Sequence, residues 1–528
     1  MSCNEIGAAS VNGINTEQAM LIKGLAKTFL ERAEETPNRL FARTVDGAQI
    51  TFAALSDAAD AMIGWLADAG VRPGDKVAVM TRNSPATLAL IHGLLRSGMI
   101  WVPVNPSLVG EGLAHAIRLV DAAVVVCDPE VHDTIANCVV QPRLGILTLV
   151  NSALPERPDS SPLFDVPPPD ALASIMFTSG TTGASKGVRV TQKMLEIATW
   201  GVEQVAMIQP GDNLYMWEPF YHVGGAQVIV LPILHDVTLT IADRFSASRF
   251  WQDVTKSGCT HIHHLGGILQ ILLKQPPSPY ERAHKVRVAW GGGCAAAAWK
   301  PFEERFGVTI TECYGMTEAS SIGAVNTQRV VGAIGKPLPW FQIRVQDETG
   351  RTLGAGEGRG EIVISSSVPG AIFAGYHNAP DATANALRSD GYYTGDAGSW
   401  GEDGLLRFHG RLTDSVRCKG ENVSAFEVES VANRHPDIEE SAMVGVPAEI
   451  GESDILLFVR LQEGATPDGD AIHLWLESRL APYQRPRFIV FLDEFPKTPS
   501  QRVRKHMLPV DPAGRWERPR TKAKADTV

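Results

Sequence analysis

A short apolar segment followed at once by a run of hydroxyl residues and glycines constrains this chain more than any other feature of its sequence. Residues 174–191 read SIMFTSGTTGASKGVRVT. The apolar letters at either end predict two strands, and glycines between them let the backbone approach a ligand closely. Hydroxyls, backbone N–H groups and an ammonium all suit phosphate oxygens. The run therefore favours a strand–loop–strand cradle for nucleotide phosphates, formed by Thr178, Ser179, Gly180, Thr181, Thr182, Gly183 and Lys186.

The same run does not fit the phosphate loop of kinases. That motif ends in Lys followed by Ser or Thr, whereas Lys186 is followed by Gly187 and a strand-like GVRV. The plain alternative is a surface loop rich in Gly, Ser and Thr. The density of hydroxyls beside a lysine favours the cradle over that alternative.

The rest of the chain predicts an α/β fold with more than one domain. Strand-like and helix-like segments alternate over 75–104 as KVAVM, PATLALIHGLLRSG and IWVPV, and AAVVVC follows. Such alternation is typical of a largely parallel sheet. A chain of 528 residues also exceeds the size at which one hydrophobic core stops growing.

Composition changes divide the chain into a loose N-terminus, two domains and a tail. Residues 1–19 are small and polar, and 509–528 are polar and basic, which predicts frayed ends. We expect a large domain over 20–410 and a compact α+β domain over 411–508. Residues 155–170 contain six prolines, which block helix interiors and ladder hydrogen bonds, so a linker between two subdomains is expected there.

Charge, hydropathy and cysteine usage exclude several classes of protein. The 48 Lys and Arg against 59 Asp and Glu give a net charge of −11, which argues against a nucleic-acid binder. Apolar runs are too short for a membrane span, and the N-terminus lacks the layout of a secretory signal. The seven cysteines are dispersed without a C-x-x-C pair, which predicts a reduced, cytoplasmic protein.

Two further motifs carry side chains suited to a nucleotide. YGMTEAS (314–320) offers the flat ring of Tyr314 for an adenine, next to the room left by the turn at 291–293. Glu318 in the same motif is a hard oxygen ligand of the kind Mg²⁺ prefers. YYTGD (392–396) ends in Asp396, which can accept two hydrogen bonds from a ribose diol, and Arg411 can donate to the same ribose. A helix cap is the plain alternative for Asp396.

Together, these strings resemble the adenylate-forming superfamily of acyl- and aryl-CoA synthetases, luciferases and peptide-synthetase adenylation domains. GRLTDSVRCKGENVSAFEVES (410–430) resembles its hinge, and PKTPSQRVRK (496–505) stands where its C-terminal lysine motif belongs. The segments HHLGGILQILLKQPPS and WGGGCAAAAW are most similar to crotonobetaine/carnitine-type CoA ligases. The resemblance implies a large N-terminal AMP-binding domain of α/β subdomains with mixed sheets and a small mobile α+β C-terminal domain.

The resemblance also implies a role for individual residues. The Mg²⁺ ligands would be Thr178 and Glu318, and His222 would lie between the nucleotide and the acyl pocket and respond to the thioester step. A pantetheine tunnel would pass Lys419 and Gly420. Nucleotide contacts are expected from the cradle and from Gly292, Gly293, Cys294, Tyr314, Gly315, Met316, Thr317, Asp396 and Arg411.

Two positions depart from the family pattern. Gln501-Arg502 stands where the family has Gly-Lys, and that lysine serves the adenylation step. Arg502 keeps the charge with a wider, planar head, while Lys505 lies three residues further on, so either could act as the catalytic cation. The hinge position, often Asp or Lys in the family, is Thr413, with Asp414 beside it.

The expected activity is an ATP-dependent carboxylic acid–CoA ligase that forms acyl-AMP and pyrophosphate, then acyl-CoA and AMP. Expected ligands are ATP, Mg²⁺, coenzyme A and a small carboxylic acid, with a homodimer left open. The alternatives are a stand-alone enzyme that loads a carrier protein, a luciferase-like oxygenase and a non-catalytic nucleotide-binding homologue.

The acid itself is not specified by the sequence. Its pocket is expected from segments 220–228, 261–270, 291–298 and 318–323, where several glycines and alanines leave room for a bulky acid. His261, His263 and His264 do not predict a metal site, because neighbouring strand residues point to opposite faces. We expect them to line the wall near the acyl pocket.

Overall fold

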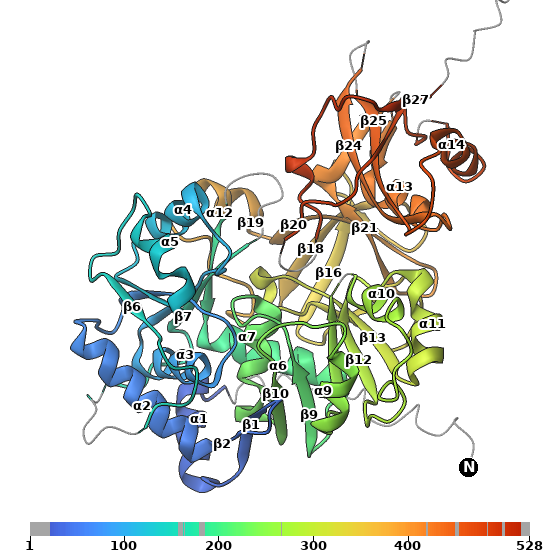
Figure 1. Cartoon of the computed structure of the whole chain (residues 1–528). Helices are drawn as coiled ribbons and strands as arrows, with labels where there is room; N and C mark the ends of the chain where they lie inside the picture. The colour runs from blue at the N-terminus through green and yellow to red at the C-terminus, as the bar shows by residue number, and fades with distance from the viewer. Residues whose placement is uncertain are drawn as a thin grey trace, which may run out of the picture. The chain divides into compact units, whose positions relative to one another are not determined.

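The fold was analysed on a computed structural model that describes residues 22–156, 162, 164–178, 185–265, 267–418, 421–448, 453–482, 484–498 and 502–518. By its internal contacts the chain divides into two units. Among the described residues, the first unit holds those before 345 together with Val363–Tyr393. The second holds Val345–Ile362 and the residues from Thr394 on (Figure 1).

One sheet of the first unit carries the predicted cradle at its edge. Its strand order is β6-β5-β3-β4-β7-β8, parallel except for the antiparallel pair β7–β8. The buried strands β3 and β5 are the apolar runs seen in the sequence. The bounds are β3 Lys76–Met80, β4 Ile100–Pro103, β5 Val124–Cys127, β6 Ile146–Thr148, β7 Leu172–Phe177 and β8 Gly187–Thr191.

The second sheet of this unit has the order β15-β14-β13-β12-β11-β9-β10-β1-β2. The run from β13 to β1 is parallel, and β2, β14 and β15 pair antiparallel. The bounds are β1 Leu40–Thr44, β2 Gln49–Thr51, β9 Asp212–Met216, β10 Val237–Ile241, β11 His261–Leu265, β12 Val288–Gly292, β13 Thr309–Tyr314, β14 Ala324–Asn326 and β15 Lys336–Pro337.

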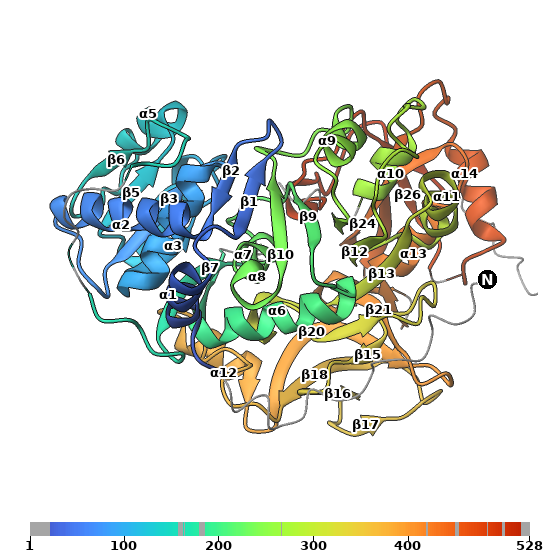
Figure 2. The ribbon, with the colours of Figure 1, turned by 90° about the horizontal axis from the view of Figure 1, so that it is seen from below.

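Helices cover these sheets, and their ends follow the sequence. α3 (Pro85–Ser97) begins after the N-cap Ser84, whose side chain accepts from the Thr87 N–H, and ends at the left-handed Gly98. α6 (Gln192–Ala206) packs against β12, β13 and β14 (Figure 2). α9, α10 and α11 form one apolar cluster with the opposite face of β11–β13. The remaining bounds are α1 Leu25–Glu35, α2 Phe52–Asp68, α4 Gly110–Val120, α5 His132–Ala136, α7 Val223–Ile229, α8 Leu231–Leu234, α9 Phe250–Lys256, α10 Ile268–Leu273, α11 Ala296–Phe306 and α12 Pro380–Ala386.

A third sheet, β17-β16-β18-β20-β19 with β21 on β20, is crossed by the boundary between the units. The second unit also contains the hairpin β22–β23 and the sheet β24-β25-β26-β27, packed on α13 (Ala425–Ala432) and α14 (Gly469–Glu477). The bounds are β16 Phe341–Gln346, β17 Thr352–Leu353, β18 Gly360–Ser366, β19 Leu387–Arg388, β20 Gly391–Trp400, β21 Leu406–Arg411, β22 Ser415–Cys418, β23 Glu421–Ser424, β24 Ile438–Pro447, β25 Ser453–Leu461, β26 Phe488–Phe491 and β27 Trp516–Glu517.

The predicted mixed α/β fold is confirmed. The proline-rich segment 155–170 does not separate two sheets, because β7, which follows it, pairs with β4 of the sheet that precedes it. Proline marks where the chain leaves regular structure and carries no information on where the next strand pairs. The domain boundary at 410/411 stays a prediction. Residues 1–19 and 519–528 of the two predicted frayed ends lie outside the described part, whereas β27, within the predicted tail 509–528, pairs antiparallel with β26.

None of the described helices is both long and apolar enough to span a membrane.

The packing of α6 allows a stability test at Gly201. A Cβ there would lie 2.9 Å from Ile322 Cβ and 3.4 Å from Leu338 Cδ1. Gly201→Ala should lower the free energy of unfolding by about 1–3 kcal/mol, because overpacking outweighs the gain in helix propensity. Gly112→Ala in α4 is the matched control, since its nearest neighbour would be Leu108 Cδ2 at 3.5 Å. Urea unfolding of both variants measures the difference, and an unchanged Gly201→Ala would contradict the packing.

Candidate active site

The ends of four parallel strands gather the predicted residues of the first unit. β9, β11, β12 and β13 are parallel neighbours, so their carboxyl ends lie at one edge of the sheet. In open α/β sheets this edge is where ligands bind. The segments that leave it carry Glu218, His222, Cys294, Tyr314 and Glu318.

The phosphate cradle is flanked by the hairpin that the sequence predicted. β7 and β8 pair antiparallel, and the Thr178 N–H donates to the Lys186 carbonyl at 2.9 Å. Between these two residues, Ser179, Gly180, Thr181, Thr182 and Gly183 are outside the described residues. The Lys186 Nζ lies 5.0 Å from the centroid of the Tyr376 ring, a cation–π distance.

Tyr376 also contacts the predicted metal ligand. Its hydroxyl donates to Glu318 Oε1 at 2.9 Å, and both side chains are buried. The Phe373 N–H donates to the Glu318 carbonyl at 2.9 Å, and Val188 on β8 pairs with Tyr376. Tyr376 therefore joins the lysine of the cradle to the carboxylate of the YGMTE motif. Nothing in the sequence joined Tyr376 to these residues, because it lies 58 positions from Glu318.

At two positions of this edge, Gly291 and Gly315, a neighbouring backbone carbonyl leaves no room for a side chain. A Cβ on Gly291 would overlap the carbonyl oxygen of His264 on the neighbouring strand, and one on Gly315 would overlap the carbonyl of Ser321. The sequence suggested that the turn at 291–293 leaves room for a base. The structure shows that the close approach of β11 is by itself enough to exclude a side chain at Gly291.

Glu312 on β13 holds the turn that follows β12. Its Oε1 accepts the Cys294 N–H at 2.7 Å, and the Gly293 N–H also donates to this carboxylate. Burial raises the pKa of Glu312 from 4.5 to about 7, and the two N–H donors offset part of that effect. Its role could not be predicted from sequence, because the turn that it contacts follows a different strand, β12.

Asn83 holds the loop that carries His222 through two hydrogen bonds. Asn83 Nδ2 donates to the Glu218 carbonyl at 2.8 Å, and its Oδ1 accepts the Phe220 N–H at 3.0 Å. His222 is half-buried and caps α7, where its carbonyl accepts the Ala226 N–H. This arrangement places His222 at the carboxyl edge of the sheet, and its predicted position between the nucleotide and the acyl pocket stays a prediction.

The three histidines of β11 do not converge. His261 Nε2 contacts the Ala206 carbonyl at the end of α6, and His263 Nδ1 lies 2.7 Å from Glu218 Oε2. His264 points to the other face, where burial lowers its pKa to about 3. No group of three ligands that could hold a metal ion occurs in the described part of the chain.

In the second unit, the predicted ribose residues form an ion pair. Arg411 Nε lies 2.9 Å from Asp396 Oδ1, and Asp396 is opposite Arg411 in the β20–β21 pair. The Arg411 guanidinium also donates to the Thr394 carbonyl at 3.1 Å. The structure thus joins the two residues that the sequence assigned to one ribose.

The two candidate cations have different surroundings. Lys505 Nζ lies 2.7 Å from Glu429 Oε1 and 3.6 Å from Asp414 Oδ2. Burial raises the pKa of Glu429, and Lys505 offsets part of that rise. Arg502 is exposed, and its N–H donates to Thr498 Oγ1 at 3.0 Å. Lys419 and Gly420 are not among the described residues.

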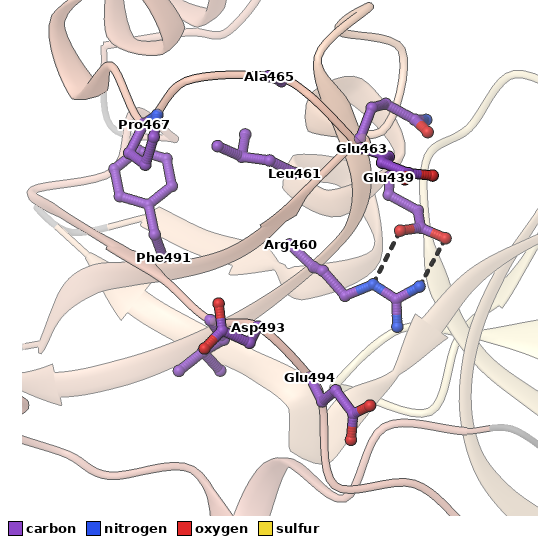
Figure 3. Close-up of a pocket in the computed structure, with 11 residues that line it drawn as sticks. Glu439, Arg460, Leu461, Glu463, Ala465, Pro467, Phe491, Asp493 and Glu494 are labelled. Carbon is purple, nitrogen blue, oxygen red and sulfur yellow. Dashed lines mark hydrogen bonds and ion pairs between the residues drawn. The ribbon is translucent and has the colours of Figure 1, made fainter.

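A hollow on the second unit contains none of the predicted site residues (Figure 3). It lies beside the end of β25 and the segment after β26, and Glu439 and Arg460 form an ion pair in it. Glu463, Asp493 and Glu494 make its rim acidic. None of the residues that line this hollow therefore belongs to the candidate active site.

Comparison with protein families matches residues 29–377 to the AMP-binding enzyme family and 427–502 to the AMP-binding enzyme C-terminal domain. The chain belongs to the AMP-binding enzyme family.

Similar proteins within this family match most of the chain. Sulfoacetate–CoA ligase of Cupriavidus necator is 31% identical over 495 residues, which cover 91% of this chain and 96% of that protein. Crotonobetaine/carnitine–CoA ligase of Citrobacter koseri is 30% identical over 484 residues, covering 87% and 93%. The solved structure of ATP-bound MatB from Rhodopseudomonas palustris has a TM-score of 0.80 at 27% identity and covers 91% of this chain and 97% of that one.

The raised pKa of Glu312 predicts a pH-dependent stability. Between about pH 4.5 and 7 the folded protein keeps a proton that the unfolded chain has lost. The free energy of unfolding therefore falls as the pH rises through this window, by up to about 3 kcal/mol, and this contribution is level above it. Glu312→Gln should remove that decline, as measured by urea unfolding at pH 5 and pH 8.

The matched control for this prediction is Glu304→Gln, at an exposed position on α11. It should leave the pH dependence of unfolding unchanged. A Glu312→Gln profile that parallels the parent would mean that the carboxyl group titrates alike in the folded and unfolded states.

Proposed function

We propose that this AMP-binding enzyme is an ATP-dependent carboxylic acid–CoA ligase. The observation that carries the proposal is the group formed by Lys186, Tyr376 and Glu318 beside the cradle hairpin. It places a cation and an oriented carboxylate on the same tyrosine side chain. CoA ligases that match 87–91% of the chain support the same reaction.

The donor set at Glu318 fits Mg²⁺. A buried carboxylate oriented by a phenol hydroxyl is a hard oxygen ligand, and the hydroxyl of Thr178 is the second proposed ligand. When bound, Mg²⁺ would offset negative charge on the phosphates. Lys186 would add a second positive charge to the same phosphates, so the residues favour the pentavalent transition state mainly by position and charge.

The proposed reaction has two displacements. First, a carboxylate oxygen of the acid attacks the α-phosphorus of ATP, and the bond to pyrophosphate breaks, which gives acyl-AMP. Next, the CoA sulfur attacks the acyl carbon, the thiol proton is lost, and the carbon–oxygen bond to AMP breaks. His222 would separate the two sites, and Asp396 with Arg411 would hold the ribose. Adenine would lie against Tyr314 and the segments of Gly292–Cys294 and Gly315–Thr317.

For the adenylation step we assign the C-terminal cation to Arg502. Lys505 is engaged by Glu429 and Asp414, so moving it to a phosphate would leave two half-buried carboxylates without their counter-charge. Arg502 is exposed on the segment that resembles the lysine motif. The C-terminal domain would turn about Thr413 and Asp414 between steps, and Lys419 and Gly420 would then line the pantetheine path.

CoA is preferred over a carrier protein as the acceptor because the similar proteins are CoA ligases. A cytoplasmic location agrees with ATP and CoA as substrates and with the six described cysteines, which are all free thiols. The homodimer stays a prediction. Incubation with ATP, an acid and free CoA, with mass detection of the thioester, tests the proposal. Acyl-AMP that persists beside unreacted CoA would favour a carrier-loading enzyme.

The cradle and the metal ligand can be tested by removing their charges. Lys186→Ala and Glu318→Ala should each slow ATP–pyrophosphate exchange by about a hundredfold, the scale of one transition-state charge contact. Lys300→Ala, an exposed lysine on α11, is the matched control. Exchange at the parent rate in both site variants would refute the nucleotide-site assignment.

The two candidate cations should differ by half-reaction. Arg502→Ala should slow acyl-AMP formation by about a hundredfold, while thioester formation from preformed acyl-AMP stays near the parent rate. Lys505→Ala should instead lower stability, because it leaves the half-buried carboxylates of Glu429 and Asp414 without a cation. An isolated adenylation defect in Lys505→Ala, with Arg502→Ala unaffected, would reverse the assignment.

A further inference from the structure

The segments at the sheet edge are almost free of ionised side chains. Residues 217–230, 261–273, 288–299 and 314–323 contain no lysine and no arginine. Two acidic residues stand in these segments, and Glu318 is assigned above to the metal. Glu218 is the other acidic residue in these four segments, and the proposed reaction assigns it no role.

Glu218 is deeply buried and paired with His263. Its exposed fraction is 2%, that of His263 is 6%, and His263 Nδ1 lies 2.7 Å from Glu218 Oε2. The His263 ring is 4.2 Å from the Trp290 ring, between their centroids. Burial of a carboxylate is costly unless it is paired, so this geometry is not incidental.

Strand register shows which way this pair faces. His263 and Trp290 are opposite each other in the β11–β12 pair, so their side chains share a face of the sheet. Ile262 and Ala289 point to the other face, into the apolar cluster with α10 and α11. The pair faces the side on which His261 contacts the end of α6.

The carboxylate also lies directly against the helix that His222 caps. A Cβ on Gly224 would overlap both carboxylate oxygens of Glu218, so α7 approaches the carboxylate with bare backbone. Glu218 is thereby placed between His263 on β11 and the first turn after His222. The acid pocket is expected from the same segments, 220–228 and 261–270.

We propose that Glu218, paired with His263, selects acids whose far end carries a positive charge or a hydrogen-bond donor, and rejects acids whose far end is a second anion. The inference rests on the proposed CoA-ligase function and deepens it. A cation or donor would share the carboxylate with His263. A second anion would meet a buried negative charge and find no lysine or arginine in the four segments to balance it.

The test uses acids that match in shape and differ in the charge at the far end. 4-(Trimethylammonio)butanoate and its neutral isostere 5,5-dimethylhexanoate form one pair, and 4-sulfobutanoate is the anionic member. 4-Aminobutanoate and pentanoate separate a donor from a methyl group. The readout is kcat/KM for pyrophosphate release, followed by mass detection of the CoA thioester.

The parent enzyme should prefer the ammonium acids to their neutral partners, and the neutral acids to the sulfonate, by at least about tenfold at each step. Glu218→Gln should abolish the first preference. Glu218→Asp, which keeps the charge, should retain part of it. Glu304→Gln on the surface of α11 should change none of these ratios.

Two outcomes would overturn the inference. The first is a parent enzyme that prefers 4-sulfobutanoate, and the second is a Glu218→Gln variant that slows every acid equally, which would make Glu218 merely structural. If no acid releases pyrophosphate, the proposed function fails. The preference is then measured by calorimetric binding of the same five acids, where an equal affinity for the cationic and anionic members overturns the inference.

Discussion

Parallel pairing of β9, β11, β12 and β13 is the constraint on which the candidate site depends. It brings the loops after four strands to one edge, although they come from segments far apart in the chain. The pairing is close enough that Gly291 must lack a side chain beside the His264 carbonyl. If these strands slipped by one residue, every side chain would change face and the site would be lost.

Each of three carboxylates at this edge is held by a different kind of partner. His263 contacts Glu218, backbone N–H groups donate to Glu312, and the Tyr376 hydroxyl donates to Glu318. A buried carboxylate is costly without such a partner, so each pairing fixes a loop as well as a charge. The edge consequently gathers three carboxylates, each with a defined partner.

Local sequence predicted the alternating strands and helices, the cradle hairpin and Glu318, because these depend on near neighbours. It could not predict the Tyr376 contact, since that residue is 58 positions from Glu318 and no spacing rule joins them. The choice between Arg502 and Lys505 was open for the same reason. Only the fold shows that Glu429 and Asp414 engage the lysine. The sheet to which β7 belongs is likewise set by its pairing with β4, which is distant in sequence.

The bare glycine at the end of β12 has a consequence for how this scaffold can diversify. Gly291 admits no replacement without moving the neighbouring strand, whereas Ala296 and Ala297, a few residues on, are exposed at the start of α11. Substitutions at Gly291 would almost always be destabilising, whereas substitutions at Ala296 and Ala297 would have little structural cost. Changes in side-chain size near this edge would therefore accumulate along the first turn of α11, while Gly291 resists replacement.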